Sequence, residues 1–190
     1  MINKWITKEK KRVFSSPILS VDVSSRVSED GKSGDFVTLS LPSWVSIIPI
    51  KRREDGVLVF IMENQFRHGS ETVTREFPAG LIEEGESKED AAKRELLEET
   101  GLVGELEEIA SFNPNPAFMT NEQSFFLARN LKKVSTQNLD ENEEIEVVEV
   151  PVETVIREMG TGPYSNGIMM AALFVYMRKA ESCPELRRKI

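Results

Sequence analysis

The sequence lacks the features of a secreted or membrane protein. Its single cysteine, Cys183, cannot form a disulfide within the chain, which is typical of a reducing compartment. The N-terminal segment has no apolar centre of the kind found in a signal peptide. The longest apolar run, residues 168–177, has about half the length needed to cross a membrane. We therefore expect a cytoplasmic protein without a membrane span.

Positive charge is scarce. The chain has 24 lysines and arginines against 32 aspartates and glutamates, which gives a formal net charge of -8. Such a field disfavours polyanions, so a nucleic-acid polymer is not an expected partner. A small phosphorylated molecule remains compatible with this charge, because local arginines and a bound metal ion can outweigh the overall field.

The first part of the chain has the pattern of a β-hairpin. Residues 19–23 and 37–41 alternate apolar and polar side chains, and turn-forming residues lie between them at positions 28–34. We expect residues 1–42 to form a small antiparallel strand unit. Its core would be too small for independent stability, so it must pack on something else.

The remaining residues, 43–190, have a mixed pattern of strands and helices, which predicts an α/β domain with a mixed sheet flanked by helices. Ser87 is a good N-cap for one of the helices, and Gly101 follows its last turn. The expected strands are residues 44–50, 57–62, 73–77, 106–112, 123–128 and 145–150, and the expected helices are residues 88–100, 152–159 and 167–179.

The helix at residues 88–100 carries an acidic cluster. The spacing of Glu95, Glu98 and Glu99 places three carboxylates on one helix face, where they repel one another. Glu86, just before the helix, could reach the same face, and Arg94 could hold a carboxylate. Hard divalent cations would turn the repulsion into attraction. The alternative is an ordinary solvated acidic face.

The wider pattern favours the cation. Residues 80–102 read G-x5-E-x7-R-E-L-x-E-E-x-G-L, and seven fixed residues at these offsets arise by chance with a probability below roughly 10⁻⁸ per start position. This run resembles the signature of the Nudix hydrolases at every position. The matching residues are Gly80, Glu86, Arg94, Glu95, Leu96, Glu98, Glu99, Gly101 and Leu102.

The resemblance implies hydrolysis of a nucleoside diphosphate linked to another moiety X, with Mg²⁺ or Mn²⁺ as cofactor. It also implies a Nudix α/β/α sandwich. By this resemblance Glu95 and Glu99 are expected as the principal metal ligands, and Glu98 as a further ligand. Glu98 and Arg94 are also expected among the catalytic residues, with Glu86 and Gly80 in support.

Residues before the motif narrow the resemblance to ADP-ribose pyrophosphatases. Residues 75–80, R-E-F-P-A-G, are similar to their E-x-P-A-G segment, in which the alanine carbonyl helps to hold a metal; here this would be Ala79. The run Q-F-R ending at Arg67 is similar to their strand end, which implies that Arg67 contacts substrate phosphate. The alternative for Arg67 is an exposed strand-terminal arginine.

Two loops complete the expected site. The acidic loop at residues 140–147 resembles the loop that supplies a catalytic base, with Glu143 as the first candidate and Glu141 as the second. A solvated acidic loop is the alternative. The loop at residues 113–120 lies where ADP-ribose enzymes carry a diagnostic proline, and Phe118 in it is a candidate substrate contact.

The resemblance also implies a homodimer, in which the N-terminal unit swaps across and lines the partner's active site. Trp5 or Trp44 could then stack on a base, although core packing or a dimer contact is favoured for Trp44 because of its apolar neighbours. The expected reaction converts ADP-ribose to AMP and ribose 5-phosphate. GDP-mannose or another nucleotide sugar is an alternative substrate, and a non-catalytic nucleotide-sugar sensor is an alternative of another class.

Overall fold

The computed structural model describes residues 2–186, which form two compact units. Within the described residues, one unit consists of residues 2–43 with Phe112–Gln123, and the other of Trp44–Ser111 with residues 124–186. The segment Phe112–Gln123 contains the predicted substrate loop, so this loop belongs to the same unit as the N-terminal strands. None of the helices among the described residues is long and apolar enough to cross a membrane.

The first unit is a three-stranded antiparallel sheet in the order β1-β2-β3. The predicted hairpin is present as β2 (Ser20–Ser28) and β3 (Ser33–Ser40). The strand β1 (Trp5–Ser15) was not predicted, because its basic run has no alternation of apolar and polar residues. All its residues are exposed.

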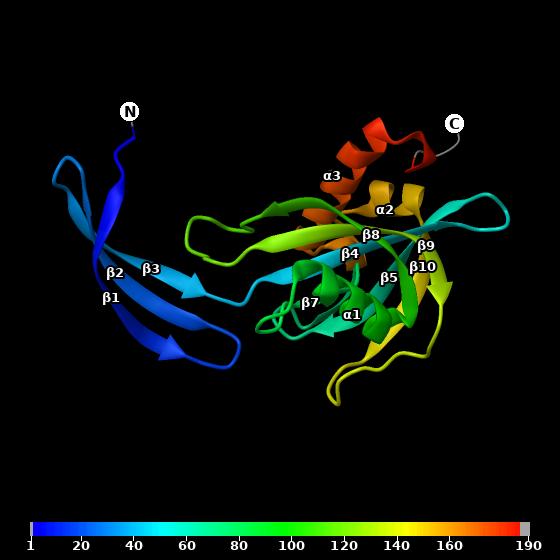
Figure 1. The fold of residues 1–190 in the computed structure, drawn as a ribbon, viewed down its shortest axis with the longest axis horizontal. Helices are drawn as coiled ribbons and strands as arrows, with labels where there is room; N and C mark the ends of the chain where they lie inside the picture. The colour runs from blue at the N-terminus through cyan, green and yellow to red at the C-terminus, as the bar shows by residue number, and fades with distance from the viewer. Residues whose placement is uncertain (1, 187–190) are drawn as a thin grey trace. The chain divides into compact units, whose positions relative to one another are not determined.

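The second unit is built on a larger mixed sheet with the strand order β10-β5-β4-β9-β8 (Figure 1). Two short strands lie off this path, β6 beside β5 and β7 beside β4. The strands are β4 (Trp44–Arg52), β5 (Leu58–Arg67), β6 (Thr72–Glu76), β7 (Ala79–Leu81), β8 (Leu102–Phe112), β9 (Gln123–Lys133) and β10 (Ile145–Pro151).

Helices cover both faces of this sheet, as the predicted α/β/α sandwich requires. The helix α1 (Lys88–Thr100) packs through Ala91, Ala92 and Leu96 on Val45 and Ile47. On the other face lie α2 (Val152–Glu158) and α3 (Gly167–Ser182), coloured orange to red in Figure 1. Two short 3-10 helices, Gly162–Tyr164 and Pro184–Leu186, complete the unit.

The core on the α3 face is aromatic. The ring of Phe60 meets those of Phe77 and Tyr176 edge to face, at centroid distances of 5.1 and 4.8 Å. All three rings are almost fully buried. Burial of one such side chain stabilises a fold by about 1.5–3 kcal/mol, and edge-to-face contacts add to it. This side of the sheet is therefore a rigid base for the residues at its edge.

The central strands pair with each other over only part of their length. Residues Ile50–Arg52 of β4 pair with Leu58–Phe60 of β5. Further along, β4 pairs with β7 and β5 pairs with β6. The backbone N–H of Ile47 donates to the Pro78 carbonyl at 2.8 Å. The central strands therefore take different partners at this end of the sheet, and the residues discussed next gather there.

Candidate active site

The acidic helix begins and ends where the sequence predicts. The Ser87 hydroxyl accepts a hydrogen bond from the backbone N–H of Asp90 at 3.1 Å, which caps the N-terminus. Gly101 ends the helix with φ of 67°, a left-handed conformation that favours glycine. A Cβ at Gly101 would also collide with the Ser135 carbonyl. Local capping therefore sets the position of every side chain on α1.

The three carboxylates of the predicted cluster lie near the C-terminal end of α1. The helix dipole is negative there and disfavours negative charge, and the last turn has no basic residue to offset it. Glu99 is buried, with 4 % of its surface exposed, and Glu95 is half-buried. Burial raises the pKa of Glu95 and of Glu99. The fold itself therefore opposes ionisation at these positions.

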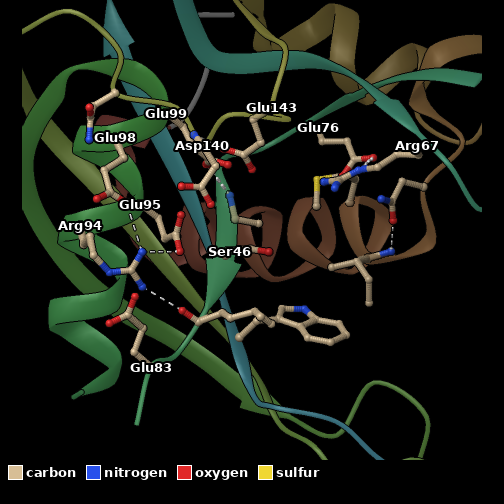
Figure 2. A pocket seen from close by; sticks show the side chains of 18 of the residues that line it. Ser46, Arg67, Glu76, Glu83, Arg94, Glu95, Glu98, Glu99, Asp140 and Glu143 are labelled. Carbon is tan, nitrogen blue, oxygen red and sulfur yellow. Dashed lines mark hydrogen bonds and ion pairs between the residues drawn. The ribbon is translucent and has the colours of Figure 1, made fainter. Parts of the chain in front are cut away.

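Arg94 ties the loop before α1 to the helix. Its guanidinium donates to the Glu86 carboxylate at 3.0 Å, to Glu95 at 2.7 Å and to Glu98 at 3.2 Å. It also donates to the Leu81 carbonyl at 2.9 Å. Figure 2 shows Arg94 between the helix carboxylates and this loop. Glu86 thus contacts Arg94 and does not line the cavity described below, so its supporting role stays a prediction.

Backbone atoms of β7 contact the acidic cluster. The Ala79 N–H donates to Oε2 of Glu99 at 2.9 Å. At Gly80 an added Cβ would overlap the carboxylate of Glu95, so only glycine allows this side chain to lie so close to the strand. Ala79 and Gly80, at the start of the motif segment, are therefore close to the carboxylates predicted to bind metal.

The acidic loop is fastened to the C-terminal end of α1 at its start. The Gln137 side-chain amide donates to the Glu99 carbonyl at 2.7 Å, and the Asn138 N–H donates to the Glu98 carbonyl at 2.8 Å. Helix-terminal carbonyls need such donors. Two residues further on, Asp140 begins the turn that carries Glu143. The loop's acidic side chains are thus held next to the acidic helix.

The opposite wall holds an arginine–glutamate pair. Arg67, at the end of β5, donates from Nε and Nη2 to the two oxygens of Glu76 at 3.1 and 2.8 Å. Although burial alone would raise the pKa of Glu76, hydrogen bonds from Arg67, Thr74 and Asn166 lower it. Glu76 stays charged and holds the guanidinium in a defined orientation. Glu76 is the first residue of the predicted E-x-P-A-G segment, but its pairing with Arg67, nine residues earlier, was not predicted.

These elements surround a cavity of about 770 Å³ that lies within the second unit. Figure 2 shows Arg94 and Glu95 on one side, Arg67 with Glu76 on the other, and Asp140 and Glu143 between them. Apolar side chains of Trp44, Ile168 and Met169 also line it. Its volume is that of a small-molecule site.

Eight of the predicted site residues line this cavity, and three do not. Those that line it are Arg67, Ala79, Gly80, Arg94, Glu95, Glu98, Glu99 and Glu143. Glu86 lies behind Arg94, and Glu141 is exposed in the acidic loop. Phe118 belongs to the first unit, where it is 41 % exposed. Trp5 also lies there and packs on Phe36, whereas Trp44 lines the cavity in place of the favoured core position.

The donor set fits a hard divalent cation. Within residues 2–186 no group of three or more histidine, cysteine, aspartate or glutamate side chains is arranged so that it could hold a metal ion; Arg94 pairs with Glu95 and Glu98, so metal binding would require these carboxylates to move. The donors at hand are carboxylate oxygens without histidine or cysteine sulfur, as Mg²⁺ and Mn²⁺ prefer. The close approach of Glu95 to Gly80 and the burial of Glu99 beside Ala79 keep these donors together.

Comparison with known families agrees with this geometry. Residues 42–170 match the model of the NUDIX domain, which covers more than half of the chain. The chain belongs to the Nudix family. Nudix hydrolases generally depend on a divalent metal ion, which agrees with the donor set of the cavity.

Two relatives match this chain over most of its length. An ADP-ribose pyrophosphatase of Bacillus subtilis is 33 % identical over 153 residues, which is 80 % of both chains. A protein of Bacillus methanolicus named methanol dehydrogenase activator is 29 % identical over 92 % of this chain and 94 % of its own. Among solved structures, an ADP compounds hydrolase superposes with a TM-score of 0.83 over 96 % of this chain and 97 % of that chain, at 22 % identity. This likeness shows that the fold is shared.

Proposed function

We propose that this protein hydrolyses the pyrophosphate bond of a nucleoside diphosphate linked to X, and that ADP-ribose is its preferred substrate. The products would be AMP and ribose 5-phosphate. The main support is one cavity in which the Nudix carboxylates Glu95 and Glu99 lie opposite the Arg67–Glu76 pair. Relatives named ADP-ribose pyrophosphatase, one of them 33 % identical, support the choice of substrate.

The metal would be Mg²⁺, or Mn²⁺ in its place. Glu95 and Glu99 would hold it, with Glu98 and the Ala79 carbonyl as further ligands; all four residues line the cavity. A bound divalent cation would neutralise the negative charge on the pyrophosphate oxygens. Carboxylates on a rigid helix hold their positions better than those on a loop, and the two caps of α1 provide that rigidity.

The protein's own side chains would bind the substrate and move the proton. Arg67, already oriented by Glu76, would donate to a phosphate oxygen. A water molecule would attack one phosphorus atom, Glu143 would accept its proton, and the bridging P–O bond would break with the second phosphate as leaving group. Glu143 lines the cavity, which favours it over Glu141 as the base.

Aromatic stacking on the base is the proposed role of Trp44. Its indole belongs to the cavity wall together with Ile168 and Met169, so an adenine could lie against it in an apolar part of the site. Phe118 and Trp5 remain proposed contacts that would have to come from the unit in which they lie.

The activity is tested by incubating the purified chain with ADP-ribose and Mg²⁺ and identifying products by anion-exchange chromatography. We expect AMP and ribose 5-phosphate in equal amounts, and their loss on addition of EDTA. Parallel reactions with GDP-mannose and ADP-glucose address the alternative of another nucleotide sugar, which a mouse relative named ADP-sugar pyrophosphatase favours (39 % identical over 55 % of this chain). No hydrolysis of any of these compounds would overturn the proposal.

A second candidate function is regulation of another enzyme. The relative named methanol dehydrogenase activator favours it, because the match extends over nearly both chains. The alternative of a non-catalytic nucleotide-sugar sensor falls in the same class. Adding wild type and Glu99→Gln to a methanol dehydrogenase assay separates the candidates. Equal stimulation by both proteins would favour regulation without hydrolysis.

We also propose a cytoplasmic homodimer in which residues 1–42 form a dimerisation and substrate-lining unit and residues 43–190 the hydrolase domain. The first unit exposes apolar side chains, including Ile6, Val13 and Phe14, each more than half exposed. Its first 15 residues hold five basic side chains and one acidic one in an otherwise acidic chain, so a second acidic copy is an electrostatically suitable partner. Light scattering after gel filtration should give twice the mass of 21.5 kDa, and a monomer would contradict the proposal.

A further inference from the structure

Glu63 is a buried acidic residue on an otherwise apolar strand. It follows Val59, Phe60, Ile61 and Met62 on β5, and only 3 % of its surface is exposed. Successive strand side chains point to opposite faces. Phe60 and Met62 belong to the core on the α3 face, so Glu63 points to the opposite face, which is covered by α1.

Two neighbours of Glu63 on the same face line the cavity. Arg67 lies four residues further along β5, on the same face, and Glu76 is the Cα partner of Glu63 across β6. Arg67 and Glu76 both line the cavity, whereas Glu63 does not. Glu63 therefore lies on the same face of these strands as this pair, but it is not among the residues that line the cavity.

One carboxylate oxygen of Glu63 is without a partner. Among residues 2–186, its Oε1 atom is buried and accepts no hydrogen bond. The nearest cation along the strand is Arg67, whose Nε and Nη2 donate to Glu76. A buried carboxylate oxygen without a partner is strongly unfavourable, and an apolar residue would suit this strand position better. Among residues 2–186 no hydrogen bond to Oε1 offsets this cost, and the charge of Arg67 offsets it only in part.

The groups around Glu63 are mostly acidic. Burial raises the pKa of Glu63; Arg67 opposes the shift, and the carboxylates of Glu143, Glu76 and Glu95 add to it. Burial followed by the charge of Glu63 likewise raises the pKa of Glu99. The Glu63 carboxyl thus lies within electrostatic reach of carboxylates on α1 and in the acidic loop. A divalent cation among them would relieve all of these repulsions at once.

We propose that Glu63 takes part in divalent-cation binding together with Glu99, as an acidic group outside the motif of residues 80–102. The proposal rests on the function proposed above, because it concerns the same cavity. Glu63 would thus contribute to binding Mg²⁺ or Mn²⁺, although it lies 17 positions before the motif begins and does not line the cavity. It also gives a reason for an acidic residue in a buried strand.

The test measures the affinity of the full chain for Mn²⁺ in the absence of substrate. Electron paramagnetic resonance gives the concentration of free Mn²⁺ at each point of the titration. Wild type is compared with Glu63→Gln, which keeps the size of the side chain, and with Glu63→Val, which suits a buried strand. Glu146→Gln on β10 is the control, because Glu146 is exposed and contacts only Asn64 among the described residues. We expect both Glu63 variants to bind Mn²⁺ at least roughly tenfold more weakly, with the control unchanged.

Thermal melts separate this effect from loss of folding. Without metal, Glu63→Val should melt at the same or a higher temperature than wild type, because a buried carboxylate with one oxygen lacking a partner has been removed. The increase in melting temperature caused by Mn²⁺ should shrink in both variants. Binding by both variants with wild-type affinity and stoichiometry would overturn the inference.

Glu99→Gln distinguishes the inference from the function on which it rests. If Glu99→Gln loses Mn²⁺ while both Glu63 variants keep it, only the role of Glu63 is wrong. If Glu99→Gln also binds Mn²⁺ like wild type, the metal assignment of the proposed function is wrong as well. Weakened binding in the variants at both positions supports the two together.

Discussion

Two buried carboxylates, one in each unit, have opposite surroundings. Asp22 in the three-stranded sheet is 1 % exposed and Glu99 on α1 is 4 % exposed. Asp22 receives Arg12 Nε at 3.1 Å, Lys10 Nζ at 3.0 Å and the Ser40 hydroxyl at 3.1 Å. The side chain of Glu99 receives the backbone N–H of Ala79; Arg67 lies within electrostatic reach, but the charges that raise the pKa of Glu99 are those of Glu63, Glu95 and Glu143.

The electrostatic consequences are also opposite. Hydrogen bonds from Arg12 and then Lys10 lower the pKa of Asp22 from 3.8 to about 2. Burial and then the carboxylates Glu63 and Glu95 raise the pKa of Glu99. A buried carboxylate that has its own basic partners keeps its charge, whereas one whose neighbours are mainly acidic is unfavourable when ionised unless a cation binds beside it. The two carboxylates therefore differ in their electrostatic surroundings within a single chain, as expected if Asp22 has a structural role and Glu99 the proposed functional one.

The largest expected effect is on catalysis by Glu99→Gln. Removing one proposed metal ligand should lower kcat for ADP-ribose roughly 1,000-fold, which is about 4 kcal/mol of transition-state stabilisation. Asp22→Asn, the matched change in the other unit, should leave kcat within about twofold at neutral pH, provided that the protein is folded. Steady-state assays with saturating Mg²⁺ measure both. Full activity of Glu99→Gln would break the comparison.

The acidic loop should show the next largest effect. Glu143→Gln removes the proposed base, and kcat should fall roughly 100-fold because general-base catalysis typically contributes at least that much. Glu141→Gln is the matched control, because Glu141 lies in the same loop but does not line the cavity. Equal losses in both variants would show that the loop acts through its net charge and not through one positioned residue.

A smaller effect is expected at the opposite wall. Arg67→Lys keeps the charge but loses the two parallel hydrogen bonds to Glu76, so the phosphate contact loses its orientation. We expect kcat/KM for ADP-ribose to fall roughly tenfold, about 1.4 kcal/mol, with unchanged metal affinity. Initial rates over a range of ADP-ribose concentrations give the value. A change in metal affinity alone would place Arg67 in a different role.

The smallest effects concern stability and its dependence on pH. The lowered pKa of Asp22 stabilises the folded state above pH 3.8, and this contribution is lost as the pH falls towards 2. Asp22→Asn should therefore melt below wild type at pH 5 and close to it at pH 2. Thermal melts followed by circular dichroism measure the difference.

Glu99→Gln should behave in the opposite way in metal-free buffer. Because the folded-state pKa of Glu99 is raised, its ionisation destabilises the fold increasingly as the pH rises above 4.5, the ordinary value of a glutamate. The variant should melt above wild type at pH 8, and this advantage should decrease towards pH 5. The same pH trend in both variants would remove the distinction between the two carboxylates.

The sequence was sufficient wherever the signal is local. Ser87 and Gly101 mark the ends of α1, and both caps are present as predicted. The strand β1 was not predicted because its basic run does not alternate apolar and polar residues. The strand β7 was not predicted because it has only three residues. Helix caps and periodic elements have recognisable sequence patterns, whereas a short strand or a strand held by long-range pairing does not.

The same limit applies to the site. The motif identified the carboxylates of α1, because their spacing on one helix determines their geometry. Glu76 and Glu63 gain their positions only when β5 and β6 pair, and Trp44 reaches the cavity because β4 pairs with β7 there. Neither of these strand pairings can be predicted from a fixed spacing of residues in the sequence. The proposed base and substrate contacts depend on loops and therefore remain predictions.

The most direct test is titration calorimetry with Mg²⁺ on metal-free wild type, Glu99→Gln and Asp22→Asn. The account predicts that wild type and Asp22→Asn bind Mg²⁺ with the same affinity, and that Glu99→Gln binds at least roughly tenfold more weakly. Retention of wild-type affinity by Glu99→Gln, or absence of Mg²⁺ binding by the wild-type protein, would contradict the claim that the buried carboxylates of the cavity require a cation.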